Sequence, residues 1–239
     1  MKSHFSYIRL LSLVFFMFSA HLTKALTWDE MKQFFNEFRK NPATVGAIAP
    51  SSSLVGTEIT KYFVNAIKQE TATKTIHVLE VGAGTGCLTK VIEAIVDKNH
   101  DIDIKVDVVE ISPEFCTILR QKFENNQRIT IHCKSIINWN PDYRYDFIIC
   151  TLPFNSFEST LMKSIIEHLQ TLIYPGGVLS YVAYAGIADI KKHFLWGNAK
   201  KQHLEKINTL KSLRKKYQID ARTVIVNCPP IRIYHLEII

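Results

Sequence analysis

The fold is decided by Ile76-His77-Val78-Leu79-Glu80-Val81-Gly82-Ala83-Gly84-Thr85-Gly86, an apolar run that carries an acid and opens into three alternating glycines. The residues that follow are apolar at helical spacing: Leu88, Val91, Ile92 and Ile95. The pattern predicts a strand, a glycine turn and a helix. Glycines allow a tight turn and the close approach of a ligand. The helix would direct its first backbone N–H groups at that ligand.

A second acid supports a nucleotide-like ligand. Glu110 ends a strand predicted at 106–111 and lies 24 positions after Gly86, close to the usual spacing for a carboxylate that binds a ribose. The set Glu80, Gly82, Gly84, Gly86 and Glu110 resembles the class I S-adenosylmethionine-dependent methyltransferases. The resemblance implies S-adenosyl-L-methionine as cofactor, with its methionine end at the glycine turn and its ribose on Glu110. It also implies a Rossmann-like α/β fold: a seven-stranded, mostly parallel sheet with helices on both faces.

Composition limits the class of protein and its partners. The chain has 239 residues, enough for one α/β domain with added elements, and a net charge of +7. Such a charge favours an acidic partner, either nucleic acid or an anionic membrane surface. The five cysteines are scattered and form no C-x-x-C pair. We therefore expect neither a metal site nor a disulfide framework.

The N-terminal segment resembles a targeting sequence. Basic residues precede an apolar run at 10–20, which is typical of a signal peptide and too short for a comfortable membrane span. Export conflicts with a cofactor that is made in the cytoplasm. A membrane anchor, a later start at Met17 or Met31, and export all stay open. We expect three parts: 1–25, signal-like or anchor; 26–70, an amphipathic helix and cap; and 71–239, the methyltransferase domain.

An amphipathic helix is predicted after residue 26. Thr27-Trp28-Asp29-Glu30 has the form of a capping box. An apolar stripe follows, made of Met31, Phe34, Phe35 and Phe38, with basic residues beside it. Such a helix either packs on the domain's own core or lies in a membrane interface.

Next comes Val45-Gly46-Ala47-Ile48-Ala49-Pro50-Ser51-Ser52, before a helix predicted at 54–67. This string is similar to the segment before the cofactor domain of bacterial phospholipid N-methyltransferases, which convert phosphatidylethanolamine to phosphatidylcholine. The resemblance runs from about Phe34 to the end of the chain and includes Asn227-Cys228-Pro229-Pro230. The family usually has an apolar residue at Cys228 and alanine at Ile231.

The third strand, predicted at 129–133, is followed by Lys134-Ser135. Related methyltransferases often carry Gly-Asp there, and the acid meets the adenine amine. In this chain adenine would be held by the backbone, by Ser135, or by packing against Ile111 and Ile136.

The fourth strand, predicted at 145–150, delivers the expected substrate-binding residues Thr151, Leu152, Pro153 and Phe154. In adenine-N6 methyltransferases an Asn or Asp opens this motif and accepts the hydrogens of the base amine. Thr151 lacks a rigid amide carbonyl, which argues against a base amine. Leu-Pro followed by an aromatic residue fits the phospholipid enzymes. Phe154 would either stabilise positive charge through its π face or belong to the core.

A basic region precedes the C-terminus. Residues 191–216 contain nine Lys or Arg and one acid, Glu205, with apolar residues at helical spacing. Helix is expected there, with a face that is simply solvated, docks anionic lipid, or binds RNA. Strands predicted at 178–184, 223–227 and 233–238 complete the sheet.

We expect a phospholipid N-methyltransferase, monomeric, on the cytoplasmic side of a membrane and without a nucleic-acid partner. Methyl transfer needs an aligned neutral amine and neither a nucleophilic residue nor a metal. Tyr62, Tyr181, Tyr184 and the histidines are candidate bases, and spacing singles out none. The alternatives are an rRNA adenine N6-dimethyltransferase, suggested by Glu-x-Gly-x-Gly-x-Gly-x-Leu-Thr from Glu80, and a degenerate module that binds lipid or RNA.

Overall fold

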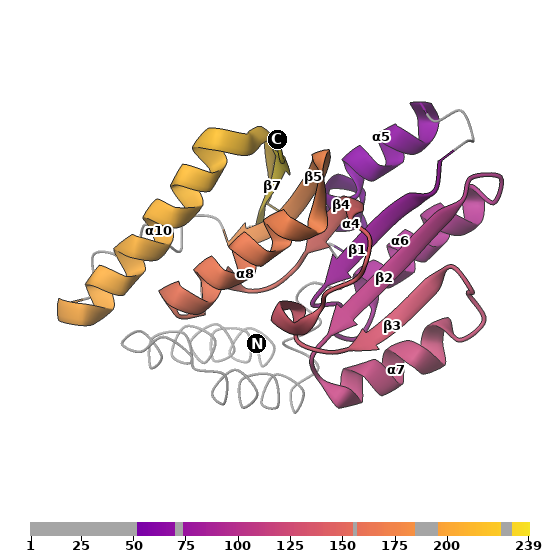
Figure 1. Ribbon diagram of the computed structural model, residues 1–239, viewed down its shortest axis with the longest axis horizontal. Coiled ribbons are helices and arrows are strands. Elements are labelled where there is room, and N and C mark those ends of the chain that lie inside the picture. Colours follow the sequence, from indigo (N-terminus) through magenta and orange to yellow (C-terminus); the bar gives the residue numbers. More distant parts are fainter. Residues whose placement is uncertain (1–51, 70–73, 155–156, 185–195, 226–230) are drawn as a thin grey trace, which may run out of the picture.

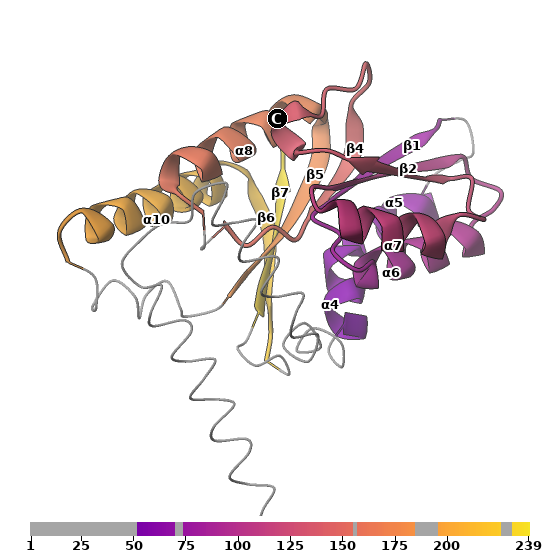
Figure 2. The ribbon, with the colours of Figure 1, turned by 90° about the horizontal axis from the view of Figure 1, so that it is seen from below.

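The computed structural model describes residues 52–69, 74–154, 157–184, 196–225 and 231–239. The predicted signal-like segment, the amphipathic helix after residue 26, most of the Val45–Ser52 string and the Asn-Cys-Pro-Pro motif lie outside the described residues. What is described is a sheet covered by helices on both faces (Figures 1 and 2).

The sheet has seven strands in the order β3-β2-β1-β4-β5-β7-β6. Their bounds are β1 Ile76–Val81, β2 Ile104–Glu110, β3 Ile129–Cys133, β4 Tyr145–Cys150, β5 Ile173–Tyr184, β6 Gln218–Val224 and β7 Ile231–Glu237. Strands β1 to β5 pair in parallel, and β7 is antiparallel to both of its neighbours. This confirms the predicted fold class. The strand order reverses between β1 and β4, so the carboxyl ends of these strands open a crevice suited to a ligand.

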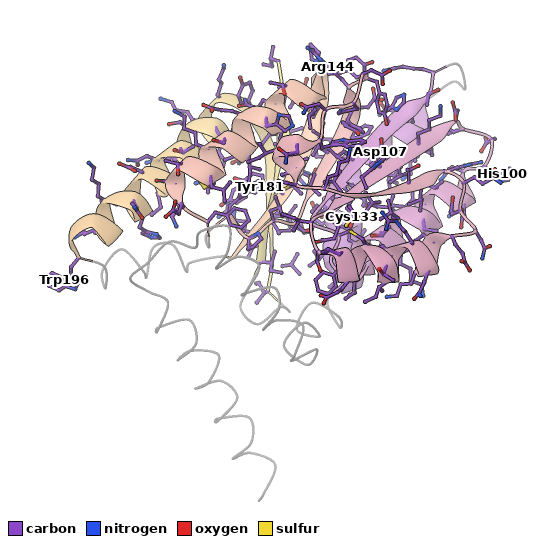
Figure 3. All side chains as sticks on the ribbon, turned by 60° about the horizontal axis from the view of Figure 1, so that its bottom comes forward. His100, Asp107, Cys133, Arg144, Tyr181 and Trp196 are labelled. Carbon is purple, nitrogen blue, oxygen red and sulfur yellow. The ribbon has the colours of Figure 1, made fainter. Side chains whose placement is uncertain are left out.

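The helices form two layers. Their bounds are α4 Ser52–Ile59, α5 Lys61–Gln69, α6 Cys87–Lys98, α7 Pro113–Phe123, α8 Ser159–Leu172 and α10 Gly197–Tyr217, with a 3-10 helix at Ile136–Asn138. In Figure 2, α4 to α7 lie on one side of the sheet and α8 and α10 on the other. Each layer has its own buried apolar cluster. Figure 3 shows Tyr181 inside the α8 layer and Trp196 at the outer start of α10.

Several predicted boundaries were wrong. Strand β5 begins at Ile173, earlier than the predicted 178, and β2 and β7 are shifted by one or two residues at each end. The helix expected at 54–67 is divided into α4 and α5, because the Thr60 hydroxyl donates to the Gly56 carbonyl at 2.7 Å and bends the chain there. Strand β6 begins at Gln218, earlier than the predicted 223. Its first residues are mostly exposed at the sheet edge, so they lack the apolar pattern that marks a buried strand.

The single basic helix α10 fills much of the region where helix was predicted. Within the described residues, no helix combines the length and apolarity needed to cross a membrane.

Candidate active site

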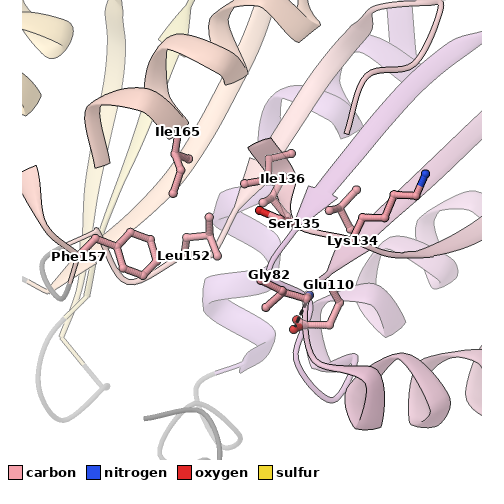
Figure 4. Close-up of a pocket in the computed structure, with 11 residues that line it drawn as sticks. Gly82, Glu110, Lys134, Ser135, Ile136, Leu152, Phe157 and Ile165 are labelled. Atoms are coloured by element: carbon pink, nitrogen blue, oxygen red, sulfur yellow. Dashed lines mark hydrogen bonds between the residues drawn. The ribbon is translucent and has the colours of Figure 1, made fainter. Parts of the chain in front are cut away.

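A pocket opens where β1, β2 and β4 end (Figure 4). It is lined by Val81, Gly82, Val109, Glu110, Ile111, Lys134, Ser135, Ile136, Leu152, Phe157 and Ile165. Most of these side chains are apolar, and the charged or hydroxyl groups gather along one wall. A flat, partly polar ligand would fit such a lining.

The glycine turn brings the backbone close to this pocket. Gly82, Gly84 and Gly86 have φ of 80°, 57° and 86°, a conformation that favours glycine. A Cβ on Gly82 would lie 2.8 Å from Leu152 Cδ2, so only glycine lets β1 end against the β4 loop. Gly86 is the N-cap of α6, and a Cβ there would lie 2.8 Å from Leu119 Cδ2.

Glu110 is held by three backbone N–H groups. Gly84 donates to Oε2 at 2.8 Å, while Ile111 and Ser112 donate to Oε1, each at 2.9 Å. Burial raises the pKa of Glu110, and these hydrogen bonds lower it by a smaller amount. A carboxylate has about four acceptor positions, so one on Oε2 stays available for a ligand hydroxyl. The geometry fits the predicted ribose contact.

Glu80 has a different environment. It is fully buried, does not line the pocket, and neither of its oxygens has a hydrogen bond with the described residues. Burial, opposed by the Thr89 hydroxyl and aided by the charge of Glu110, raises its pKa to about 8. Its predicted contact with the cofactor therefore stays a prediction.

The expected adenine contacts come together. Ile111, Ser135 and Ile136 all line the pocket. The Ser135 Oγ is buried and has no hydrogen-bond partner among the described residues, as expected of a group that awaits a ligand. Lys134 is exposed, and its Nζ lies 5.8 Å from the centre of the Trp139 ring.

Of the four expected substrate-binding residues, only Leu152 lines the pocket. Thr151, its neighbour in the chain, donates its hydroxyl to the Gly82 carbonyl at 2.8 Å. Pro153 is half-buried, and Phe154 is buried in the α8 layer. The Phe154 ring lies edge-on to Tyr181, with ring centres 5.7 Å apart. Of its two predicted roles, the structure therefore supports that of a core residue.

Five lining residues were not predicted to bind: Val81, Val109, Lys134, Phe157 and Ile165. Val81 and Val109 are sequence neighbours of predicted residues. They could have been predicted from their position beside the motifs. Phe157 and Ile165 come from the segment after β4 and from α8, and only the folded chain brings them to the pocket.

Within the described residues, no candidate base lines the pocket. Neither Tyr62 nor Tyr181 lines the pocket, and burial raises the pKa of both, that of Tyr181 to about 12. Both therefore stay protonated at neutral pH.

A separate polar cluster is formed by Glu58, Asp220 and His235, whose potential ligand atoms all lie within 4.8 Å of one another. Lys61 Nζ lies 2.5 Å from Asp220 Oδ2 and 3.6 Å from Glu58 Oε1. Because this ammonium already pairs with both carboxylates, the cluster is an ion-pair network. The predicted lack of a metal site stays a prediction.

Comparisons with known proteins agree with this geometry. Residues 78–177 match a family model described as a methyltransferase domain. The ornithine lipid N-methyltransferase of Singulisphaera acidiphila is 29% identical over 161 residues, 64% of this chain and 78% of that protein. The tRNA1(Val) (adenine(37)-N6)-methyltransferase of Aliivibrio fischeri is 25% identical over 158 residues, 59% of this chain and 64% of that protein.

The fold is also that of a solved methyltransferase. The N-methyltransferase NodS from Bradyrhizobium japonicum WM9 gives a TM-score of 0.55 at 14% identity, over 78% of this chain and 96% of that one. A second NodS structure, with S-adenosyl-L-homocysteine bound, gives 0.51 at 12% identity, over 74% and 86%. The matched methyltransferase domain and the Rossmann-like fold shared with solved methyltransferases agree: the chain is an S-adenosylmethionine-dependent methyltransferase.

Proposed function

We propose that this enzyme methylates the amine of a lipid headgroup, converting phosphatidylethanolamine stepwise to phosphatidylcholine. The observation that carries the proposal is the chemistry of Thr151 at the β4 end. Its hydroxyl proton is committed to the Gly82 carbonyl, so toward any substrate it can only accept a hydrogen bond. Beside it, Leu152 and Phe157 offer apolar surface. One acceptor next to apolar walls suits a small amine on an apolar molecule.

The reaction is an in-line displacement. S-adenosylmethionine, held by Glu110 and the glycine turn, would supply an electrophilic methyl group; the neutral amine of the substrate would take that methyl group, with the sulfonium sulfur as the leaving group and loss of one proton from the nitrogen. Among the described pocket residues, the ionisable side chains are Glu110, already held by backbone, and Lys134. We therefore assign the rate enhancement mainly to alignment of the reactants. Apolar surroundings also lower the pKa of an ammonium and so favour the neutral amine.

The outer face of α10 supports a membrane partner. Its exposed residues include five lysines, Lys200, Lys201, Lys211, Lys215 and Lys216, and one acid, Glu205. Leu204 is 39% exposed and Trp196, at the start of the helix, is 83% exposed. Lysines attract anionic lipid with about 1 kcal/mol each, and tryptophan prefers the interface. We place the enzyme on the cytoplasmic surface of a membrane, because its cofactor is made in the cytoplasm.

An RNA adenine methyltransferase is the second candidate. The similarity to the tRNA1(Val) enzyme favours it, and the lysines of α10 would also suit a phosphate backbone. Thr151 counts against it, because a hydroxyl replaces the amide or carboxylate that would hold a base amine.

Transfer of a labelled methyl group from S-adenosylmethionine tests both candidates. Three substrates are offered in parallel: phosphatidylethanolamine–phosphatidylglycerol vesicles, tRNA lacking modification, and small ribosomal subunits lacking methylation. Label in the lipid, lost in Glu110→Ala, is expected. Label in either RNA with none in the lipid would reject the proposal. Product analysis by thin-layer chromatography then counts the methyl groups added.

A further inference from the structure

Helix α10 reaches into the active site through a buried lysine. Lys206 is 9% exposed, and its Nζ donates to the backbone carbonyl of Phe157 at 2.9 Å. Phe157 is the residue whose ring lines the pocket beside Leu152 (Figure 4). Burying an ammonium group costs free energy unless its hydrogens are donated to acceptors. This charge-assisted hydrogen bond therefore holds both Lys206 and the Phe157 carbonyl in place.

Two further contacts join α10 to the same region. The Ser159 hydroxyl donates to Glu205 at 3.3 Å, where α8 begins. The Arg214 guanidinium donates to the Tyr181 hydroxyl at 3.4 Å, and Tyr181 packs edge-on against Phe154. One helix therefore holds residues on both sides of the chain segment that leaves β4 and passes the pocket.

The opposite face of α10 carries the lysines described above. Residues 203, 206, 210 and 213 face the core, while 200, 204, 211 and 215 face outward. A helix of a few turns behaves as a rigid body. Binding of a surface to the outer face of α10 therefore also restrains the residues on its inner face.

We propose that Lys206 is a positioning residue that couples the docking face of α10 to the active site. It fixes the Phe157 backbone, so that the Phe157 ring closes the pocket, and a surface bound to the outer lysines steadies this arrangement. The surface role of α10 rests on the proposed function. The effect of Lys206 on the pocket does not, because it requires no lipid.

The first test measures the pocket alone. Binding of S-adenosylhomocysteine is measured by calorimetry for the wild type, Lys206→Met, Lys206→Arg and Lys163→Met. Lys163 is an exposed lysine of α8 and controls for loss of one positive charge. We expect the dissociation constant to rise at least fivefold in Lys206→Met and to return within twofold in Lys206→Arg. Unchanged affinity in Lys206→Met would overturn the positioning role.

Loss of stability is a competing explanation. Leu210→Ala removes buried packing of α10 and leaves the lysine contact in place. If it weakens cofactor binding as much as Lys206→Met does, the proposal is wrong. Should Lys206→Met fail to fold, Arg214→Met is measured in the same way. A two- to threefold loss of affinity is expected there, and no loss would overturn the coupling.

The second test measures coupling on vesicles that contain the anionic lipid phosphatidylglycerol. In Lys206→Met the maximal methylation rate should fall about tenfold, while the half-saturating vesicle concentration stays unchanged. In the triple variant Lys201→Gln, Lys211→Gln, Lys215→Gln, the half-saturating concentration should rise and the maximal rate should also fall, because the surface no longer steadies the arrangement at Phe157. A triple variant that keeps the wild-type maximal rate at saturating vesicles would refute the coupling. If no lipid is methylated but Lys206→Met still weakens cofactor binding, the lipid function fails and the positioning role survives.

Discussion

Replacing Glu80 with glutamine should stabilise the protein, by an amount that grows with pH. Glu80 is fully buried, and its oxygens have no hydrogen bond with the described residues. Burial, opposed by Thr89 and aided by Glu110, raises its pKa from the ordinary 4.5 to about 8. At neutral pH the carboxyl is therefore protonated in the folded protein and ionised in the unfolded chain.

The sign and size of the effect follow from these two pKa values. Because the folded-state pKa is the higher one, the carboxyl stabilises the fold most below the unfolded-state pKa. This contribution is lost as the pH rises to about 8. Between the two values, the free energy of unfolding falls by about 1.4 kcal/mol per pH unit. From about pH 6 to about pH 8, the wild type should lose roughly 2–3 kcal/mol relative to Glu80→Gln.

Urea unfolding at several pH values measures this difference. The free energy of unfolding is determined for the wild type and Glu80→Gln without cofactor. Glu124→Gln, at the exposed end of α7, is the matched control for the substitution. A difference between wild type and Glu80→Gln that does not change across this pH range would refute the reasoning. It would mean that Glu80 is ionised in the folded protein.

Four other substitutions test the pocket and the glycine turn beside it. Glu110→Gln places an amide N–H₂ against a backbone N–H and should raise the dissociation constant of S-adenosylhomocysteine at least tenfold by calorimetry; a change below threefold would contradict the ribose assignment. Gly86→Ala should lower the free energy of unfolding by about 2–4 kcal/mol, and Gly84→Ala by about 1 kcal/mol, since only the first Cβ meets α7 side chains. Equal losses in urea unfolding would show that backbone strain alone matters. Ser135→Ala should leave stability nearly unchanged and weaken S-adenosylhomocysteine about fivefold, because its hydroxyl has no partner in the described protein. Unaltered binding would remove Ser135 from the adenine site.

The sequence predicts some strands of the sheet better than others. Strands β1 and β4 have the bounds that were predicted, because buried parallel strands are short continuous apolar runs between polar turns. Strand β3 also has its predicted bounds, although it lies at one edge and is mostly half-buried. Strand β6 pairs only with β7 at the edge, and its residues are mostly exposed. Its position is fixed by antiparallel pairing with β7, the next strand along the chain, so its own residues need not form a buried apolar pattern.

The candidate site shows the same limit at the level of single side chains. Gly82, Glu110 and Ser135 follow or end strands, so their place at the carboxyl edge could be predicted from strand order. Phe154 and Phe157 lie in an irregular segment, where no periodicity tells which ring faces the core. The structure places both rings in the buried cluster of the α8 layer, and of the two only Phe157 also lines the pocket.

Glu80 and Glu110 look alike in the sequence, and folding separates their chemistry. Glu110 ends its strand, so the backbone that turns after it supplies N–H groups to its carboxylate. Glu80 lies one residue inside its strand and turns its carboxyl toward the α6 layer, where no such donor reaches it. If the positive sulfonium or amine of S-adenosylmethionine binds near Glu80, it will lower the pKa of that carboxyl. The pH dependence of stability described for Glu80 would then shrink when the cofactor is bound. If it persists undiminished, Glu80 shapes the glycine turn without contacting the cofactor.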